Sequence, residues 1–106
     1  MPLEDYLLSG EKVYVQTPPY VGYRGEYYEA VITNKRLILY ARRGFVFKSD
    51  DVISVKLDEI ADLRYREDGI ILKTAIIEIW GKRRIRLEGP VSTMKALYRL
   101  LQLFIK

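Results

Sequence analysis

The hydrophobic period of the chain changes once, near residue 89, and this change constrains the fold more than any other feature. From residue 12 to residue 88, apolar and polar side chains alternate in short runs separated by turn-forming residues. This pattern is typical of half-buried β-strands. After Gly89-Pro90 the apolar residues recur every three or four positions, which predicts one amphipathic helix. Its apolar face would comprise Met94, Leu97, Tyr98, Leu101, Phe104 and Ile105.

Turn signals divide the β region into about seven expected strands. Residues 17–25 are interpreted as a loop because they hold two prolines and two glycines. Asp50-Asp51 is interpreted as a break, Asp68-Gly69 as a hairpin turn, and residues 3–9 as a short opening turn or helix. The expected strands are 12–17, 26–33, 36–41, 52–57, 61–66, 75–80 and 83–88, with further short strands at 45–48 and 70–73. The predicted fold is mainly β, a barrel or sandwich whose open end is covered by the terminal helix.

The composition excludes most enzyme chemistry. The chain of 106 residues suits one domain, residues 1–106, and contains neither cysteine nor histidine. Disulfides, thiolate nucleophiles and the commonest general base and metal ligand are therefore missing. A Ser–Lys arrangement is the one nucleophilic scheme left open, because no histidine activates a serine. No glycine-rich phosphate loop precedes a helix. We expect a protein that is not an enzyme, with no cofactor and no metal site.

The first residues and the amide content bear on location and source. Met1–Glu11 carries three acidic residues and does not resemble a signal peptide. Val13–Tyr23, the longest run without charge, is too short and too polar to span a bilayer, so a soluble cytoplasmic protein is expected. One asparagine, two glutamines and many charged residues are typical of proteins from hot environments. A melting temperature in the mesophile range would contradict that hypothesis.

Several motifs together resemble a known family. Leu8–Val13 reads L-S-G-E-K-V, Glu29–Tyr40 contains T-N-K-R-L, and Leu57–Leu63 begins L-D-E-I. With the Asp-Gly hairpin and the Gly-Pro-led helix, they resemble the short pleckstrin-homology-like (PH-like) domains of bacteria and archaea, which are similar to GRAM domains. The resemblance implies a partly open barrel of two near-orthogonal antiparallel sheets capped by one C-terminal helix. It also implies a binding or oligomerising module.

The resemblance implies little for inositol phosphates. In some PH domains a basic motif around the first two strands binds them. In this chain that region offers only Lys12 and Arg24, and Glu26 and Glu29 interrupt the basic pattern.

Apolar side chains on the expected outer faces predict self-association. With Leu37 and Leu39 in the core, the alternating residues of that strand face outward, and Trp80 does the same on its own strand. Large exposed apolar surfaces mark interfaces. We therefore predict a homo-oligomer whose candidate interface residues are Trp80, Ile38, Tyr40, Leu100 and Leu103. In the alternative interpretation, neighbouring segments of the same chain cover these side chains.

Basic residues give a second hypothesis, an anionic lipid headgroup or phosphate as ligand. The net charge is +4, and the densest basic cluster lies at residues 82–86. Together with the turn at Thr33–Arg36, this cluster supplies the candidates Lys35, Arg36, Lys82, Arg83, Arg84 and Arg86. A guanidinium of this cluster is placed to stack on Trp80. The other interpretation is a charged face that protects an edge strand from aggregation.

The loop at 17–25 supplies further ligand candidates, Tyr20, Tyr23 and Arg24. A plain connecting loop is the alternative. Nucleic acid is an unlikely partner, because the tyrosines cluster in the more acidic N-terminal part rather than beside the basic cluster.

Overall fold

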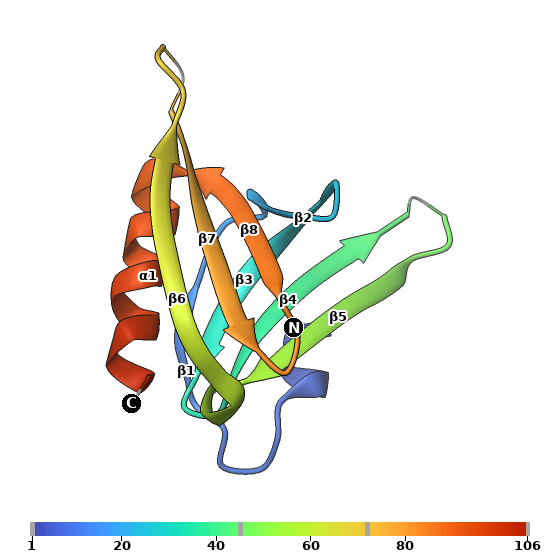
Figure 1. Cartoon of the computed structure of the whole chain (residues 1–106). Coiled ribbons are helices and arrows are strands. Elements are labelled where there is room, and N and C mark those ends of the chain that lie inside the picture. The colour runs from blue at the N-terminus through green and yellow to red at the C-terminus, as the bar shows by residue number, and fades with distance from the viewer. Residues whose placement is uncertain (1, 45, 72, 106) are drawn as a thin grey trace.

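The structure is a computed structural model that describes residues 2–44, 46–71 and 73–105. Within these residues eight β-strands precede one α-helix, and two 3₁₀-helices lie at the start of the chain and between β5 and β6 (Figure 1). The elements are η1 (Pro2–Tyr6), β1 (Val13–Gln16), β2 (Val21–Tyr23), β3 (Glu26–Thr33), β4 (Arg36–Arg43), β5 (Ser49–Lys56), η2 (Leu57–Glu59), β6 (Ile60–Asp68), β7 (Thr74–Gly81), β8 (Ile85–Pro90) and α1 (Val91–Phe104).

The strands form one curved antiparallel sheet. Its order is β5-β4-β3-β2-β8-β7-β6, and β1 pairs with the end of β3 that β2 leaves free. β2 joins the N-terminal strands to the C-terminal ones, because it pairs with β3 and, through Gly22 and Glu88, with β8. The sheet is open, since β5 and β6 end its order and neither pairs with the other. The predicted mainly β architecture with a single C-terminal helix is confirmed.

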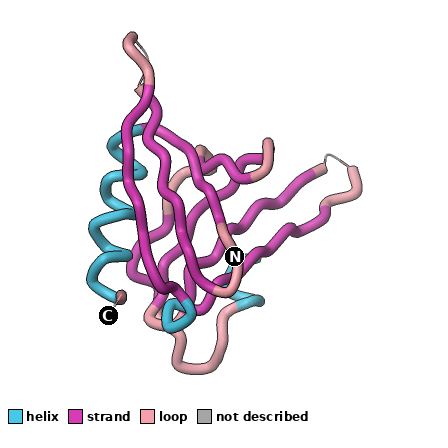
Figure 2. The backbone as a smooth tube through the Cα atoms, in the orientation of Figure 1, coloured by secondary structure: helices cyan, strands magenta, loops and turns pink. Residues whose placement is uncertain are grey.

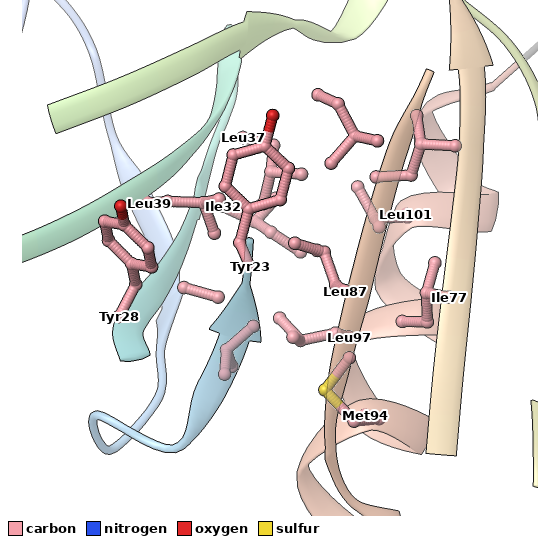
Figure 3. Packing of buried hydrophobic residues seen from close by; sticks show 14 of the residues in the cluster. Tyr23, Tyr28, Ile32, Leu37, Leu39, Ile77, Leu87, Met94, Leu97 and Leu101 are labelled. Carbon is pink, nitrogen blue, oxygen red and sulfur yellow. The ribbon is translucent and has the colours of Figure 1, made fainter. Parts of the chain in front are cut away.

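Helix α1 covers the concave side of β6, β7 and β8 (Figures 1 and 2). Three residues of its predicted apolar face, Met94, Leu97 and Leu101, are fully buried. They belong to one core cluster with inward-facing side chains of both halves of the sheet, such as Ile32 of β3 and Leu87 of β8 (Figure 3). Because apolar burial is the main favourable contribution to folding, this helix and the sheet depend on each other for stability.

A second apolar cluster lies on the outer face of the N-terminal strands. Leu3, in η1, packs there on Val31, Ile38 and Tyr40. The prediction that Ile38 and Tyr40 are exposed is wrong: they do face away from the main core, but they are 0% and 5% exposed because η1 covers them. The Tyr6 hydroxyl donates to Asp50 (2.6 Å) and holds this cover against β5. For Ile38 and Tyr40 the alternative interpretation is therefore correct: another segment of the same chain covers them.

Three segments differ from the sequence-based expectation. The expected loop at 17–25 contains β2, which ends in a two-residue turn at Arg24-Gly25 with φ of +52° and +79°, as a type I′ hairpin requires. Asp50-Asp51 lies within β5 instead of breaking it, because Arg42 and Arg43 pair with the two carboxylates, each at 3.5 Å. Ile70 and Ile71 lie at a hairpin tip instead of in a strand. Residues 45 and 72 of the expected short strands lie outside the described residues.

Candidate functional site

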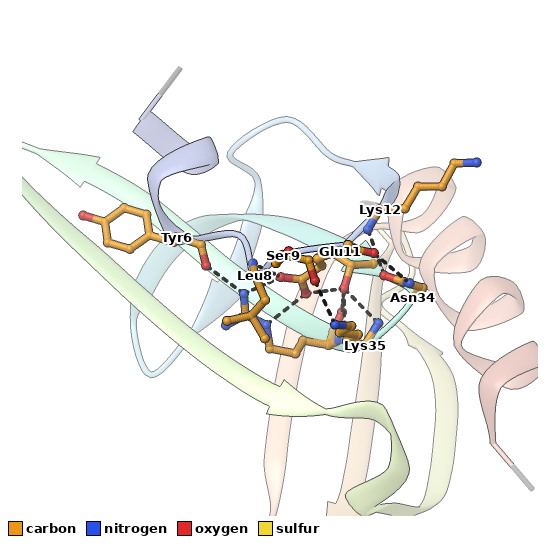
Figure 4. A network of polar contacts seen from close by, with 10 residues as sticks. Tyr6, Leu8, Ser9, Glu11, Lys12, Asn34 and Lys35 are labelled. Atoms are coloured by element: carbon orange, nitrogen blue, oxygen red, sulfur yellow. Dashed lines mark hydrogen bonds and ion pairs between the residues drawn. The ribbon is translucent and has the colours of Figure 1, made fainter.

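The turn at Thr33–Arg36 binds the N-terminal segment of its own chain (Figure 4). The Thr33 hydroxyl donates to Glu11 Oε2 (2.6 Å) and accepts from the backbone N–H groups of Lys35 and Arg36 (3.0 and 2.9 Å). The backbone N–H of Lys12 donates to Asn34 Oδ1 (2.8 Å), and the backbone N–H of Asn34 donates to the Lys12 carbonyl (3.0 Å). Two of the motifs that carry the family resemblance, L-S-G-E-K and T-N-K-R, therefore bind each other.

Arg36 and Glu11 form the centre of this contact. Arg36 donates from Nε and Nη2 to the two Glu11 oxygens (3.0 and 2.7 Å), and the Glu11 side chain is 0% exposed. The hydrogen bonds from Arg36 lower the pKa of Glu11 to about 2. Arg36, one of the predicted anion-binding residues, is therefore mostly buried and bound to a carboxylate of its own chain. Lys35 is also engaged, because its Nζ donates to the Ser9 carbonyl (3.1 Å).

The basic cluster at residues 82–86 divides into two parts. Lys82 forms an ion pair with Glu59 (3.3 Å), and Arg83 Nη2 donates to the Ser54 carbonyl on β5 (3.1 Å). These contacts attach the turn between β7 and β8 to β5 and η2, across the opening of the sheet. Lys82 and Arg83 thus have structural partners in this chain.

Arg84 and Arg86 face outward and lie beside two arginines that sequence reasoning missed. In the strand register, Arg64 of β6 lies opposite Glu78 of β7, and Glu78 lies opposite Arg86 of β8. The three side chains therefore share one face of the sheet. Arg66 lies two residues beyond Arg64 on the same face. We call Arg64, Arg66, Arg84 and Arg86 the arginine face. Their alternation was visible in the sequence, but the register that places them around Glu78 was not.

Glu78 neutralises only part of the arginine face. It is 7% exposed, accepts from Arg84 at 2.9 Å and lies 3.9 Å from Arg64. Its hydrogen bond with Arg84 is the main reason that its pKa is lowered. The Arg84 guanidinium also lies 5.3 Å from the centre of the Trp80 ring, which confirms the predicted stacking. Three arginine side chains of this face, Arg64, Arg84 and Arg86, are 62%, 67% and 54% exposed.

A hollow of about 520 Å³ adjoins the arginine face. It is lined by Arg84 and Arg86, by the β2–β3 turn with Arg24, and by the carboxylates of Glu26 and Glu88. Tyr27, which is 65% exposed, lies over Gly22 at the side of the hollow. The structure therefore brings Arg24 of the predicted ligand loop together with part of the predicted anion cluster.

The other tyrosines of the ligand loop lie elsewhere. Tyr23 is in the main core and is 7% exposed, so it offers little contact area to a ligand (Figure 3). Its burial follows from β2, whose alternate residues Val21 and Tyr23 face inward. Tyr20 is 55% exposed but does not line the hollow.

The predicted interface residues are mostly covered. Trp80 is half-buried beneath Arg84, and Leu100 is half-buried against the main core. Leu103 is 78% exposed. In the part of the chain that the structure describes, no group of acidic residues is arranged to hold a metal ion. No described helix is long and apolar enough to cross a bilayer.

Comparisons with known proteins agree with this architecture. A family model described as "Bacterial PH domain" matches residues 7–102. The chain is also similar to the crystal structure of a pleckstrin homology domain from Shewanella amazonensis SB2B, with a TM-score of 0.64 and 19% identity over 96% of this chain and 93% of that one. A search of curated proteins finds no match. No enzyme family is indicated, and the likeness to GRAM domains stays a prediction.

Proposed function

The chain belongs to the bacterial PH domain family, and from this premise we propose that it is a non-catalytic module that binds an anionic ligand at the arginine face and the adjoining hollow. PH-like domains are generally binding modules. A fold of this kind does not specify the ligand, so the proposal depends on the side chains that the fold brings together.

The observation that carries the proposal is a group of four guanidinium groups around one buried carboxylate, on a face that also carries the exposed carboxylates of Asp62 and Glu88. Arg64, Arg66, Arg84 and Arg86 share a face on which Glu78 is the one buried acid among the described residues. Guanidinium groups match phosphate and carboxylate oxygens in a two-pronged geometry. Arg86 does pair with Glu88 at 3.4 Å, but both side chains are more than half exposed. Such a pair contributes little stability, so a phosphate can compete with Glu88 for Arg86.

The hollow gives this charge a defined shape. Arg24 lines the hollow together with Arg84 and Arg86, and Tyr27 adds an exposed aromatic ring. A volume of about 520 Å³ is in the range of small-molecule sites. The phosphate of a lipid headgroup and a soluble phosphate present the same chemistry to these residues.

The test is the affinity for tripolyphosphate, measured by isothermal titration calorimetry. R84Q/R86Q is expected to bind about tenfold or more weakly than the wild type, because it removes two charge-assisted contacts. Binding by the wild type should also weaken as salt rises. K12Q/K56Q is the matched control, since it removes the same charge from exposed lysines outside the hollow and the arginine face. Equal losses in the two double variants would contradict a specific site.

Self-association is the second candidate function, with a homo-oligomer as the product. The observation that favours it is the open sheet, in which β5 and β6 each pair with one strand only. Unpaired strand edges are templates for pairing with another chain. Leu103 adds exposed apolar surface on α1. Light scattering after size exclusion, at low and high salt, tests this candidate: an oligomer that salt does not dissociate would support it, and a monomer at high concentration would contradict it.

A further inference from the structure

The mixture of charges around the hollow limits the kind of ligand that suits it. Three arginines line the hollow, Arg24, Arg84 and Arg86, and so do two carboxylates, Glu26 and Glu88. A ligand that carried only negative charge would be attracted by the arginines and repelled by the glutamates. A ligand with an anionic group at one end and neutral hydrogen-bond donors at the other would suit both sets of side chains.

The two glutamates of the hollow keep acceptor positions for such donors. Glu26 forms an ion pair with Arg43 at 3.0 Å, and Glu88 forms one with Arg86 at 3.4 Å. An ionised carboxylate has about four acceptor positions, so a single ion pair does not saturate it. The side chains of Glu26 and Glu88 are 53% and 52% exposed, so a ligand in the hollow can reach them.

Tyr27 adds an aromatic surface to the hollow. Most tyrosines of the chain lie against another ring or a guanidinium, but among the described residues Tyr27 has neither contact. Its exposed fraction of 65% is the largest of the tyrosines that the structure describes. An exposed ring beside cationic groups is a platform on which a planar aromatic group can stack.

Gly22 leaves room next to this ring. In the strand register Gly22 lies between Tyr27 of β3 and Glu88 of β8. Tyr27 Cε1 lies 3.7 Å, and the Glu88 carbonyl oxygen 3.5 Å, from the position that a Cβ atom on residue 22 would occupy. Because glycine has no side chain, the floor of the hollow between the Tyr27 ring and Glu88 is low. A planar group can therefore lie beside the ring while its polar edge reaches the carboxylate.

We propose that the ligand of the hollow is a purine nucleotide. Its phosphates contact the three arginines, and its base stacks on Tyr27. Adenine and guanine each carry an exocyclic amino group, and the ribose carries hydroxyls, so the two glutamates accept hydrogen bonds from these donors. A sugar phosphate has the hydroxyls but no planar group for Tyr27. The phosphate contact rests on the proposed anion site, whereas the preference for a base rests on Tyr27 and the glutamates.

Calorimetric titration of the full chain with ATP, GTP and tripolyphosphate, without divalent cations, tests the proposal. We expect ATP or GTP to bind about tenfold more tightly than tripolyphosphate, because stacking of the base adds to the phosphate contact. Y27A should remove this gain and leave the affinity for tripolyphosphate unchanged, whereas Y27F keeps the ring and should bind nucleotide as the wild type does. Y20A is the matched control, since Tyr20 is 55% exposed but does not line the hollow.

The three ligands together separate this proposal from the proposed function. We expect R84Q/R86Q to weaken the binding of all three. A wild type that binds tripolyphosphate, but binds neither nucleotide more tightly, would overturn the nucleotide proposal and leave the anion site standing. Nucleotide affinities that Y27A and Y20A change equally would also overturn it. A wild type that binds none of the three ligands would contradict the proposed function, and the nucleotide proposal with it.

Discussion

Replacing Arg36 by alanine is expected to lower the free energy of unfolding by about 3 kcal/mol or more. The substitution leaves the Glu11 carboxylate, which is 0% exposed, without its two hydrogen bonds from the guanidinium. It also removes the bond from Arg36 to the Tyr6 carbonyl (2.8 Å), which helps to hold η1 over Ile38 and Tyr40. Urea unfolding measures the change.

R42A on the same strand is the matched control for R36A. Arg42 lies 3.5 Å from Asp50 and its side chain is 46% exposed, so its loss should cost at most about 1 kcal/mol. Acid gives a second readout. The folded state lowers the pKa of Glu11 from its ordinary 4.5 to about 2, so the stabilisation is complete above pH 4.5 and is lost as the pH falls toward 2. R36A should lose stability less steeply over that range. Equal effects of R36A and R42A would contradict the role given to the Glu11 contact.

Replacing Leu97 by alanine is expected to cost about 3 kcal/mol of unfolding free energy. Leu97 lies on the buried face of α1 and is 0% exposed, so alanine leaves a cavity between the helix and the sheet. L103A removes the same atoms from a residue of the same helix that is 78% exposed, and it should change stability by at most about 0.5 kcal/mol. Thermal or urea unfolding of both variants compares the two positions.

The comparison of L97A and L103A also bears on self-association. If L103A destabilises as strongly as L97A, a second molecule must cover Leu103 in the folded protein. That outcome would favour an oligomer in which α1 contacts a second copy.

The fold was predictable because its signals are local. Alternation identified most strands, and the change of period at Gly89-Pro90 placed α1 within two residues of its observed start. The outward direction of Ile38 and Tyr40 was also predictable. Their cover was not, because η1 lies more than 30 residues earlier in the chain and no local pattern assigns it to that face.

The candidate site was predictable only in part, because strand register decides it. Arg84 and Arg86 are outward in any alternating strand, but only the pairing of β6 with β7 brings Arg64 to Glu78 and thereby to Arg86. The hairpin tips misled sequence reasoning for the opposite reason. Ile70 and Ile71 have high β-propensity, which reflects packing on a sheet, and here the chain gives them nothing to pack on.

The most direct test of an anion site at the arginine face is the set of backbone amide resonances that shift when tripolyphosphate is added to ¹⁵N-labelled protein. The account predicts shifts concentrated at residues 84–88 of β8 and its preceding turn, at 64–66 of β6 and at the β2–β3 turn, with little change at Lys35 and Arg36. Shifts centred on Lys35 and Arg36, or no shifts at concentrations that saturate other phosphate sites, would contradict it.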